Sequence, residues 1–183
     1  MVLVSLNRIG LVAILVLILI PNLCAGSPPG MNKKVQKEVN KLFDADTQSR
    51  EIGLKTDGQS HSALIREGDR AYALEHSEDL QGYVLSTSAK GRYDYFDYSI
   101  IYAMDLSVMG VLVTTYRSSH GAGICSKGWL KQFRGYQGEE LFLGKDVDSI
   151  SGATISATSM VEDMKRCTLL MEELQASGLL NQD

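Results

Sequence analysis

Residues 95–117 read YFDYSIIYAMDLSVMGVLVTTYR, and this stretch indicates the fold most clearly. Aromatic and β-branched residues dominate both of its halves and favour strands over about 96–104 and 108–117. Between the two halves, Asp105-Leu106-Ser107 is suited to a turn. The stretch therefore predicts an antiparallel hairpin in the middle of the protein.

Shorter apolar runs, split by Gly, Asp and Ser, precede this hairpin. They predict three more strands, near residues 62–66, 70–76 and 81–88. Further upstream, apolar residues recur at helical spacing among Lys, Glu and Gln, which predicts one amphipathic helix over about 31–43. The apolar residues of this helix are Val35, Val39, Leu42 and Phe43.

Two helical stretches follow the hairpin. Trp129 to Phe133, set among several glycines, predict one short helix. A final helix is expected from about Ser156, where apolar residues recur at helical spacing and Gly178 stands in the position of a C-terminal cap. Strands bracketed by helices at both ends predict an α+β fold, a twisted antiparallel sheet flanked by an N-terminal and a C-terminal helix.

The N-terminal segment predicts export. Residues 1–25 have the anatomy of a secretory signal peptide, because one basic residue precedes an apolar run and small residues around Ala25 mark a cleavage site. Residues 26–60 then form a leader and the N-terminal helix. We expect a protein of the periplasm or of the outer face of the cytoplasmic membrane. Two alternatives remain, an uncleaved membrane anchor through residues 2–20 and lipidation at Cys24.

Composition and spacing exclude several function classes. The chain has 18 basic and 22 acidic residues, a formal charge of -4 and a pI near 5.4, which disfavours nucleic-acid binding. Three cysteines and three histidines occur in no metal-binding spacing, and Ser151 lies in no Gly-x-Ser-x-Gly elbow, so we predict neither metal ligands nor catalytic side chains. Export permits a disulfide between Cys125 and Cys167, and two small buried side chains are the alternative.

The segment that carries chemistry is Asp148-Ser149-Ile150-Ser151-Gly152-Ala153-Thr154, a small-residue loop that enters a helix. Such a loop exposes unpaired backbone N–H groups at the positive end of the helix dipole, where an anion is stabilised. Gly152 and Ala153 permit close backbone approach, while Ser151, Thr154 and Ser156 supply hydroxyls for a phosphate or for a cap. An ordinary loop with a helix cap is built from the same residues, so the residues alone leave both interpretations open.

The string DSISGAT resembles the attachment motif of the FMN-binding domain family, which includes flavin-carrying components of the sodium-pumping NADH:quinone oxidoreductase and of the related Rnf complex. The order of the upstream elements is similar too: a strand hairpin, the Gly121-Ala122-Gly123 turn, a short helix ending in Lys131-Gln132-Phe133-Arg134-Gly135, and in the family a strand that leads to the motif. The resemblance covers about residues 60–176. We therefore expect one FMN-binding domain over 61–177 and a C-terminal tail over 178–183.

The resemblance implies that a flavin transferase takes FMN from FAD and joins its phosphate to Thr154 by a phosphoester bond. Asp148 would be read by the transferase, and Ser151, Gly152, Ala153 and Ser156 would surround the attachment point. The flavin ring is expected against Gly121, Gly123 and Trp129, with Phe133 a further candidate. For the two aromatic residues, ordinary core packing is the alternative. For Lys127 and Lys131, a phosphate contact, a docking face and an ordinary solvated surface are all compatible with the sequence.

The function that the resemblance implies is an exported flavoprotein that relays electrons between membrane or extracytoplasmic redox partners. Such a protein is an electron carrier rather than an enzyme with its own small-molecule substrate. One alternative is a module of the same fold that binds FMN reversibly or serves as a flavin-free interaction domain. A flavin reductase that acts on a small molecule is a third.

Overall fold

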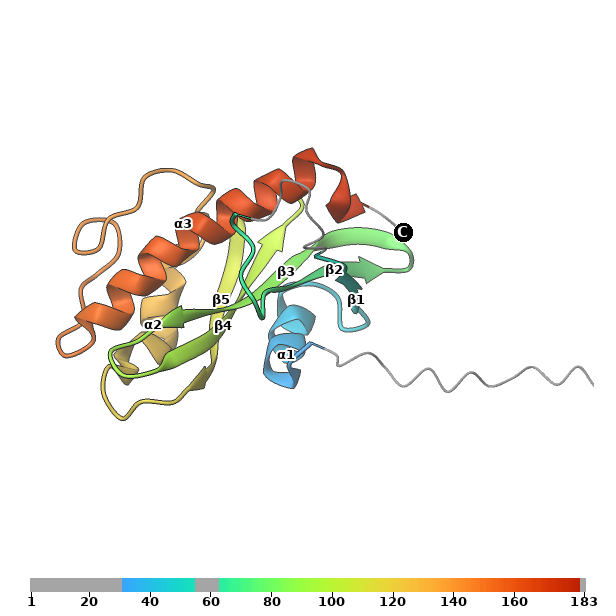
Figure 1. Cartoon of the computed structure of the whole chain (residues 1–183). Coiled ribbons are helices and arrows are strands. Elements are labelled where there is room, and N and C mark those ends of the chain that lie inside the picture. The colour runs from blue at the N-terminus through green and yellow to red at the C-terminus, as the bar shows by residue number, and fades with distance from the viewer. Residues whose placement is uncertain (1–30, 55–62, 182–183) are drawn as a thin grey trace, which may run out of the picture.

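The computed structural model describes residues 31–54 and 63–181, and it has one antiparallel sheet with helices on both faces (Figure 1). Three main helices accompany the sheet: α1 (Lys33–Leu42), the one-turn α2 (Lys127–Leu130) and the long α3 (Thr154–Ala176). Single 3-10 turns precede and follow α2 and close the C-terminus, at η1 (Ala122–Cys125), η2 (Lys131–Phe133) and η3 (Leu179–Asn181). The predicted α+β fold, with a helix at each end of the sheet, is confirmed.

The sheet is a meander, because its five strands are hydrogen-bonded in the order in which they occur along the chain. The strands are β1 (Gln48–Ile52), β2 (Arg70–His76), β3 (Asp79–Lys90), β4 (Tyr95–Ala103) and β5 (Val108–Tyr116). Each neighbouring pair is antiparallel, and β4 pairs with β5 from Phe96–Tyr116 to Tyr102–Val108. The predicted central hairpin is confirmed, with bounds within a residue of those expected.

Successive residues of the inner strands enter two different hydrophobic clusters, as the alternation of side chains along a strand requires. On β4, Ile100 and Tyr102 belong to the cluster that α3 covers, while Ile101 belongs to the cluster that α1 covers. The α1 side is the smaller one and contains Val35 and Val39, both fully buried. Because both faces are covered, these strands are apolar at consecutive positions instead of alternating with polar residues.

The two long helices agree with the periodicity in the sequence. The helix expected over about 31–43 is α1, and Asn32 caps it by accepting a hydrogen bond from Lys34 N at 2.9 Å. The final helix begins at Thr154, two residues before the expected start, and ends ahead of Gly178, whose φ of 76° is the left-handed conformation of a C-terminal cap. The short helix expected at Trp129–Phe133 is α2 with η2.

One predicted strand is wrong, and one strand of the sheet was not predicted. Residue 62 lies outside the described residues, and residues 63–66 form no strand, since 63 and 64 lie in a turn and 65 and 66 have no regular secondary structure. The backbone there bonds to side chains: Arg166 Nη1 donates to Leu64 O at 2.6 Å, and Arg66 N donates to Asp69 Oδ2 at 2.9 Å. The strand that the sequence did not predict is β1.

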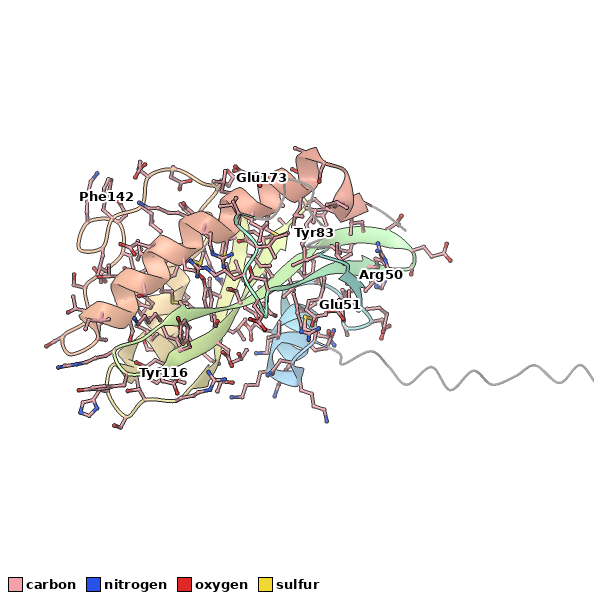
Figure 2. The ribbon with its side chains drawn as sticks, in the orientation of Figure 1. Arg50, Glu51, Tyr83, Tyr116, Phe142 and Glu173 are labelled. Carbon is pink, nitrogen blue, oxygen red and sulfur yellow. The ribbon has the colours of Figure 1, made fainter. Side chains whose placement is uncertain are left out.

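Strand β1 reads QSREI, too polar to be recognised from hydrophobic alternation. It is an edge strand, and its charged side chains pair across to β2: Arg50 with Glu75 and Arg70 with Glu51, both at 2.8 Å. Figure 2 shows Arg50 and Glu51 on this outer strand. Cross-strand pairs of opposite charge stabilise the pairing of such an edge.

The remaining expectations concern the N-terminal segment and the two cysteines, Cys125 and Cys167. The proposed signal peptide, the anchor through residues 2–20 and lipidation at Cys24 all lie outside the described residues. Within the described residues, no helix has the length and hydrophobicity to cross a membrane. Cys125 is a half-buried free thiol and Cys167 a buried one, so of the two alternatives the structure shows unpaired cysteines.

Candidate functional site

The loop that precedes α3 leaves the start of that helix open to an anion. Ala153 stands at the cap position and has no side-chain oxygen, and the first turn contains no acidic residue. Among the described residues, the N–H groups of Thr154, Ile155 and Ser156 have no hydrogen-bond acceptor; the first bond of the helix runs from Ala157 N to Ala153 O, at 2.9 Å. Unpaired donors and the helix dipole therefore act on the same small volume.

The reactive hydroxyl that the motif implies lies at the surface. Thr154 is exposed, as are Ser151, Gly152 and Asp148, and Ile155 keeps 51% of its surface accessible. Gly152 has a φ of 76°, a conformation that side-chain-bearing residues rarely adopt, and a Cβ there would meet nothing. The glycine is therefore required by the backbone of the turn and not by lack of space.

The glycine turn Gly121-Ala122-Gly123 packs directly on this loop. A Cβ on Gly121, whose φ is 83°, would lie 2.6 Å from Tyr116 Oη and 3.2 Å from Ser156 Oγ. A Cβ on Gly123 would lie 2.7 Å from Ile150 Cγ2. Two segments that the sequence connects only by resemblance are thus in contact, and only glycine permits the approach.

Ser156 is placed differently from the other hydroxyls of the motif. Its side chain is 2% exposed, and Ser156 Oγ lies 3.1 Å from Tyr116 Oη, which itself donates to the carbonyl of His120 at 2.7 Å. Because the phenol has one proton, Ser156 is the donor in the first of these bonds. The Ser156 hydroxyl, which was expected near the phosphate, therefore links α3 to the end of β5 by a hydrogen bond to Tyr116, labelled in Figure 2.

Trp129 is hydrogen-bonded to Asp148, the first residue of the motif. Its Nε1 donates to Asp148 O at 2.7 Å, and Asp148 N donates to Gln132 Oε1 at 2.9 Å, so both backbone groups of Asp148 are fixed by the α2–η2 segment. The Asp148 carboxylate stays exposed. Gln132 is a residue of this candidate site that sequence reasoning missed; the signal for it was its position in the short helix ending of the resembling family.

The two aromatic residues expected near the flavin ring are core residues to different degrees. Phe133 is fully buried and meets Trp129 edge-on with ring centroids 5.2 Å apart, so it has no surface for a ligand. Trp129 is 5% exposed and lines a shallow depression beside Asp148 and Ile150. Of the pair, only Trp129 reaches the surface of the candidate site.

An exposed aromatic pair that the sequence did not single out lies beside the glycine turn. The rings of Tyr93 and His120 meet edge-on at 5.6 Å, and Arg92 stands over Tyr93 at 5.2 Å. His120 immediately precedes Gly121, which contacts Ala153 and Ser156. Of the tyrosines in and just before β4, Tyr98 and Tyr102 are buried, while Tyr93 and Tyr95 are exposed.

Three further points concern Lys127 and Lys131, the segment that leads to the motif, and metal ligands. Lys127 and Lys131 line a groove between α1 and α2, on a different face of α2 from the residues that hold Asp148. Residues 134–153 contain only one isolated parallel bridge, between Leu143 and Val147, where the resembling family has a strand leading to the motif. Among the described residues, no group of three or more His, Cys, Asp or Glu side chains gathers as metal ligands do.

Comparison with known proteins gives a fold. No family model matches the sequence, and no curated protein does. Among solved structures, the chain is similar to the crystal structure of NqrC from Shewanella oneidensis, with a TM-score of 0.52 and 17% sequence identity. The alignment covers 81% of this chain and 91% of that chain. The chain therefore has an NqrC-like fold over most of its length.

Proposed function

We propose that this protein is an exported electron carrier that holds FMN by a phosphoester bond to Thr154. The likeness to NqrC supports the interpretation as an FMN-binding, electron-transferring domain at the level of the fold. The DSISGAT motif supplies the attachment point. A bound flavin would supply one- and two-electron redox chemistry, and the chain would supply position and surroundings.

One observation carries the proposal: an exposed threonine hydroxyl stands at the first position of a 23-residue helix whose N-terminus has neither a cap nor an acidic side chain. A phosphate esterified to that oxygen lies within reach of the unpaired N–H groups of Thr154, Ile155 and Ser156. The attachment residue and the anion-binding group are therefore the same turn of helix.

In the attachment step, the Thr154 hydroxyl oxygen bonds to the phosphorus on the FMN side of FAD, and the bond that joins this phosphorus to the oxygen of AMP breaks. AMP leaves and the hydroxyl loses its proton, so no electron is gained or lost. The step belongs to the flavin transferase. This chain presents the hydroxyl on a loop whose start is held by Trp129 and Gln132, with the Asp148 carboxylate exposed for recognition.

The site suits a carrier more than an enzyme with its own substrate. Beside Thr154, Ile155 is half exposed, and the nearby Tyr93 is 66% exposed, so the attachment point lies on an open and partly apolar surface. An open surface lets a redox partner approach the cofactor. We propose membrane or extracytoplasmic electron-transfer proteins as these partners.

The test is production of the full chain with a flavin transferase, followed by denaturing electrophoresis and intact-mass measurement. We expect a fluorescent band that survives boiling in detergent and a mass increase of one FMN less one water. Thr154→Ala removes both signals. Thr158→Ala is the matched control, since Thr158 is a threonine one turn further along α3 and should leave both unchanged.

Retention of the adduct in Thr154→Ala, or its loss in Thr158→Ala, contradicts the assignment of the site. A chain that carries no adduct but binds FMN in a dialysis experiment is the reversible flavin module instead. Mapping the N-terminus of protein from the host membrane and periplasm tests export, because cleavage near Ala25 is expected.

A further inference from the structure

A second concave surface, separate from the loop before α3, lies between α1, β5 and α2. This groove, of about 330 Å³, has residues 110–113 of β5 along its floor, together with Leu130. At Gly110 the helix α1 comes close to the strand, because a Cβ there would lie 3.3 Å from Leu42 Cδ1. The floor is apolar, since it presents two valines, two leucines and one glycine.

The rim of the groove is strongly basic. Three cations come from α1 and three from the α2–η2 segment and the residue after it, and Glu38 is the single acidic side chain that faces them among the described residues. The cations are Lys34, Lys37, Lys41, Lys127, Lys131 and Arg134. One third of the 18 basic residues of a chain with a net charge of -4 therefore converge on one groove.

Most of this charge is uncompensated within the protein. Glu38 pairs with Lys41 at 2.7 Å, and Lys34 Nζ donates to the carbonyl of Thr114 at 3.4 Å. Within residues 31–54 and 63–181, Lys37 and the three rim cations that follow α1 in the chain make no ion pair. Like charges that line one groove repel one another, so a ligand that brings several negative charges is stabilised there.

We propose that this groove binds a short acidic segment of a partner protein, with carboxylates against the rim cations and aliphatic side chains on the apolar floor. Charge complementarity selects this occupant. A second copy of the chain would bring the same six cations, which disfavours an interface between two identical grooves. A single fatty-acid carboxylate leaves most of the rim uncompensated, and a flat membrane surface meets the rim but leaves the apolar floor uncovered.

Binding is measured with the full chain and a fluorescein-labelled peptide in which pairs of glutamates alternate with leucines, by fluorescence anisotropy. The groove variant is Lys37→Glu with Lys131→Glu. The matched control is Lys33→Glu with Lys145→Glu, which changes the net charge equally: Lys33 lies on α1 outside the groove, and Lys145 lies on the loop before α3. Circular dichroism confirms that all forms are folded.

We expect the groove variant to bind the peptide at least tenfold more weakly than the wild type, and the control to bind within twofold of it. Glutamine in place of glutamate, and serine in place of leucine, should each weaken binding. Raising the salt concentration should weaken it as well, since the rim cations are exposed.

The proposal is overturned if the groove variant binds as tightly as the control, because the peptide then responds to net charge alone. It is also overturned if the peptide does not bind while vesicles containing phosphatidylglycerol bind the wild type and not the variant of Lys37 and Lys131. That result would make the groove a membrane contact. A separate readout is Cys125, whose half-buried thiol lines the groove. Bound peptide should slow its alkylation, followed by peptide mass mapping, and unchanged alkylation at saturating peptide counts against occupation of the groove.

None of these measurements needs flavin. A chain that binds the peptide but gains no adduct when it is produced with the flavin transferase supports the groove and contradicts the attachment at Thr154, and the reverse combination does the opposite. The two proposals therefore succeed or fail separately.

Discussion

The contact between the glycine turn and the loop before α3 is tested most sharply by Gly121→Ala. The new Cβ would lie 2.6 Å from Tyr116 Oη, a distance at which one of the two atoms has to move. Displacing Tyr116 weakens its bonds to His120 O and Ser156 Oγ, and each such bond contributes about 1 kcal/mol net. Alanine at a φ of 83° costs about 1–2 kcal/mol more. We therefore expect a loss of unfolding free energy of about 3–4 kcal/mol.

The assay is urea unfolding followed by tryptophan fluorescence. Trp129 is the single tryptophan of the chain and is bonded to the loop under test, so its signal reports directly on this region. The control is Gly128→Ala, because Gly128 lies in α2 with open space at its Cβ position. Alanine there should be neutral or should stabilise the helix by about 0.5–1 kcal/mol.

The reasoning is refuted if Gly121→Ala is as stable as the wild type to within about 0.5 kcal/mol, the usual range for a surface substitution. A stable variant would mean that the Gly121 turn is not held against Tyr116 and Ser156. A second consequence concerns function: Gly121→Ala should accept less flavin from the transferase than Gly128→Ala does at a temperature where both are folded.

Two further predictions concern the core beneath α3 and the alkaline limit of stability. Asp163 is 3% exposed and accepts a hydrogen bond from Arg166 Nε at 2.7 Å. Asp163→Ala should therefore lower the free energy of unfolding, measured by heat or urea, by about 3–5 kcal/mol. Glu140→Ala, at the exposed ion pair with Lys165, is the control and should change it by less than about 1 kcal/mol. Burial raises the pKa of Tyr136 from 10.0 to about 12, so between these pH values the unfolded phenol ionises before the folded one and stability falls as pH rises. Tyr136→Phe should make this alkaline decline in stability shallower. It should change the free energy of unfolding little at neutral pH, since the buried hydroxyl has no hydrogen-bond partner among the described residues. An unchanged decline would show that other groups cause it.

Local patterns in the sequence were enough for the hairpin of β4 and β5 and for the two long helices. Their side chains carry the period of the element, and burial on a sheet face or a helix stripe is what creates that period. Strand β1 has no such pattern, because an edge strand with polar residues is held by its partner. Its Arg50 meets Glu75 of β2, which lies 25 residues further along the chain.

The candidate site divides in the same way. Small residues and a helix start are visible in residues 148–154, so the loop and its exposed threonine follow from local chemistry. Ser156 looks equally available in the sequence, yet it is buried under Tyr116, a residue 40 positions away. The backbone of Asp148 is bonded to the side chains of Gln132 and Trp129, which lie 16 and 19 residues earlier, and no local pattern in the sequence predicts such contacts.

Composition and spacing thus account for the hairpin of β4 and β5, for the two long helices and for the chemical character of the attachment loop, because these depend on neighbours along the chain. The basic groove, the glycine turn against the loop and the unpaired state of Cys125 and Cys167 arise from the way distant elements pack. No pattern in the sequence connects Lys37 with Lys131. They become one electrostatic surface because β5 brings α1 and α2 to its two sides, and charge acts through space and not along the chain.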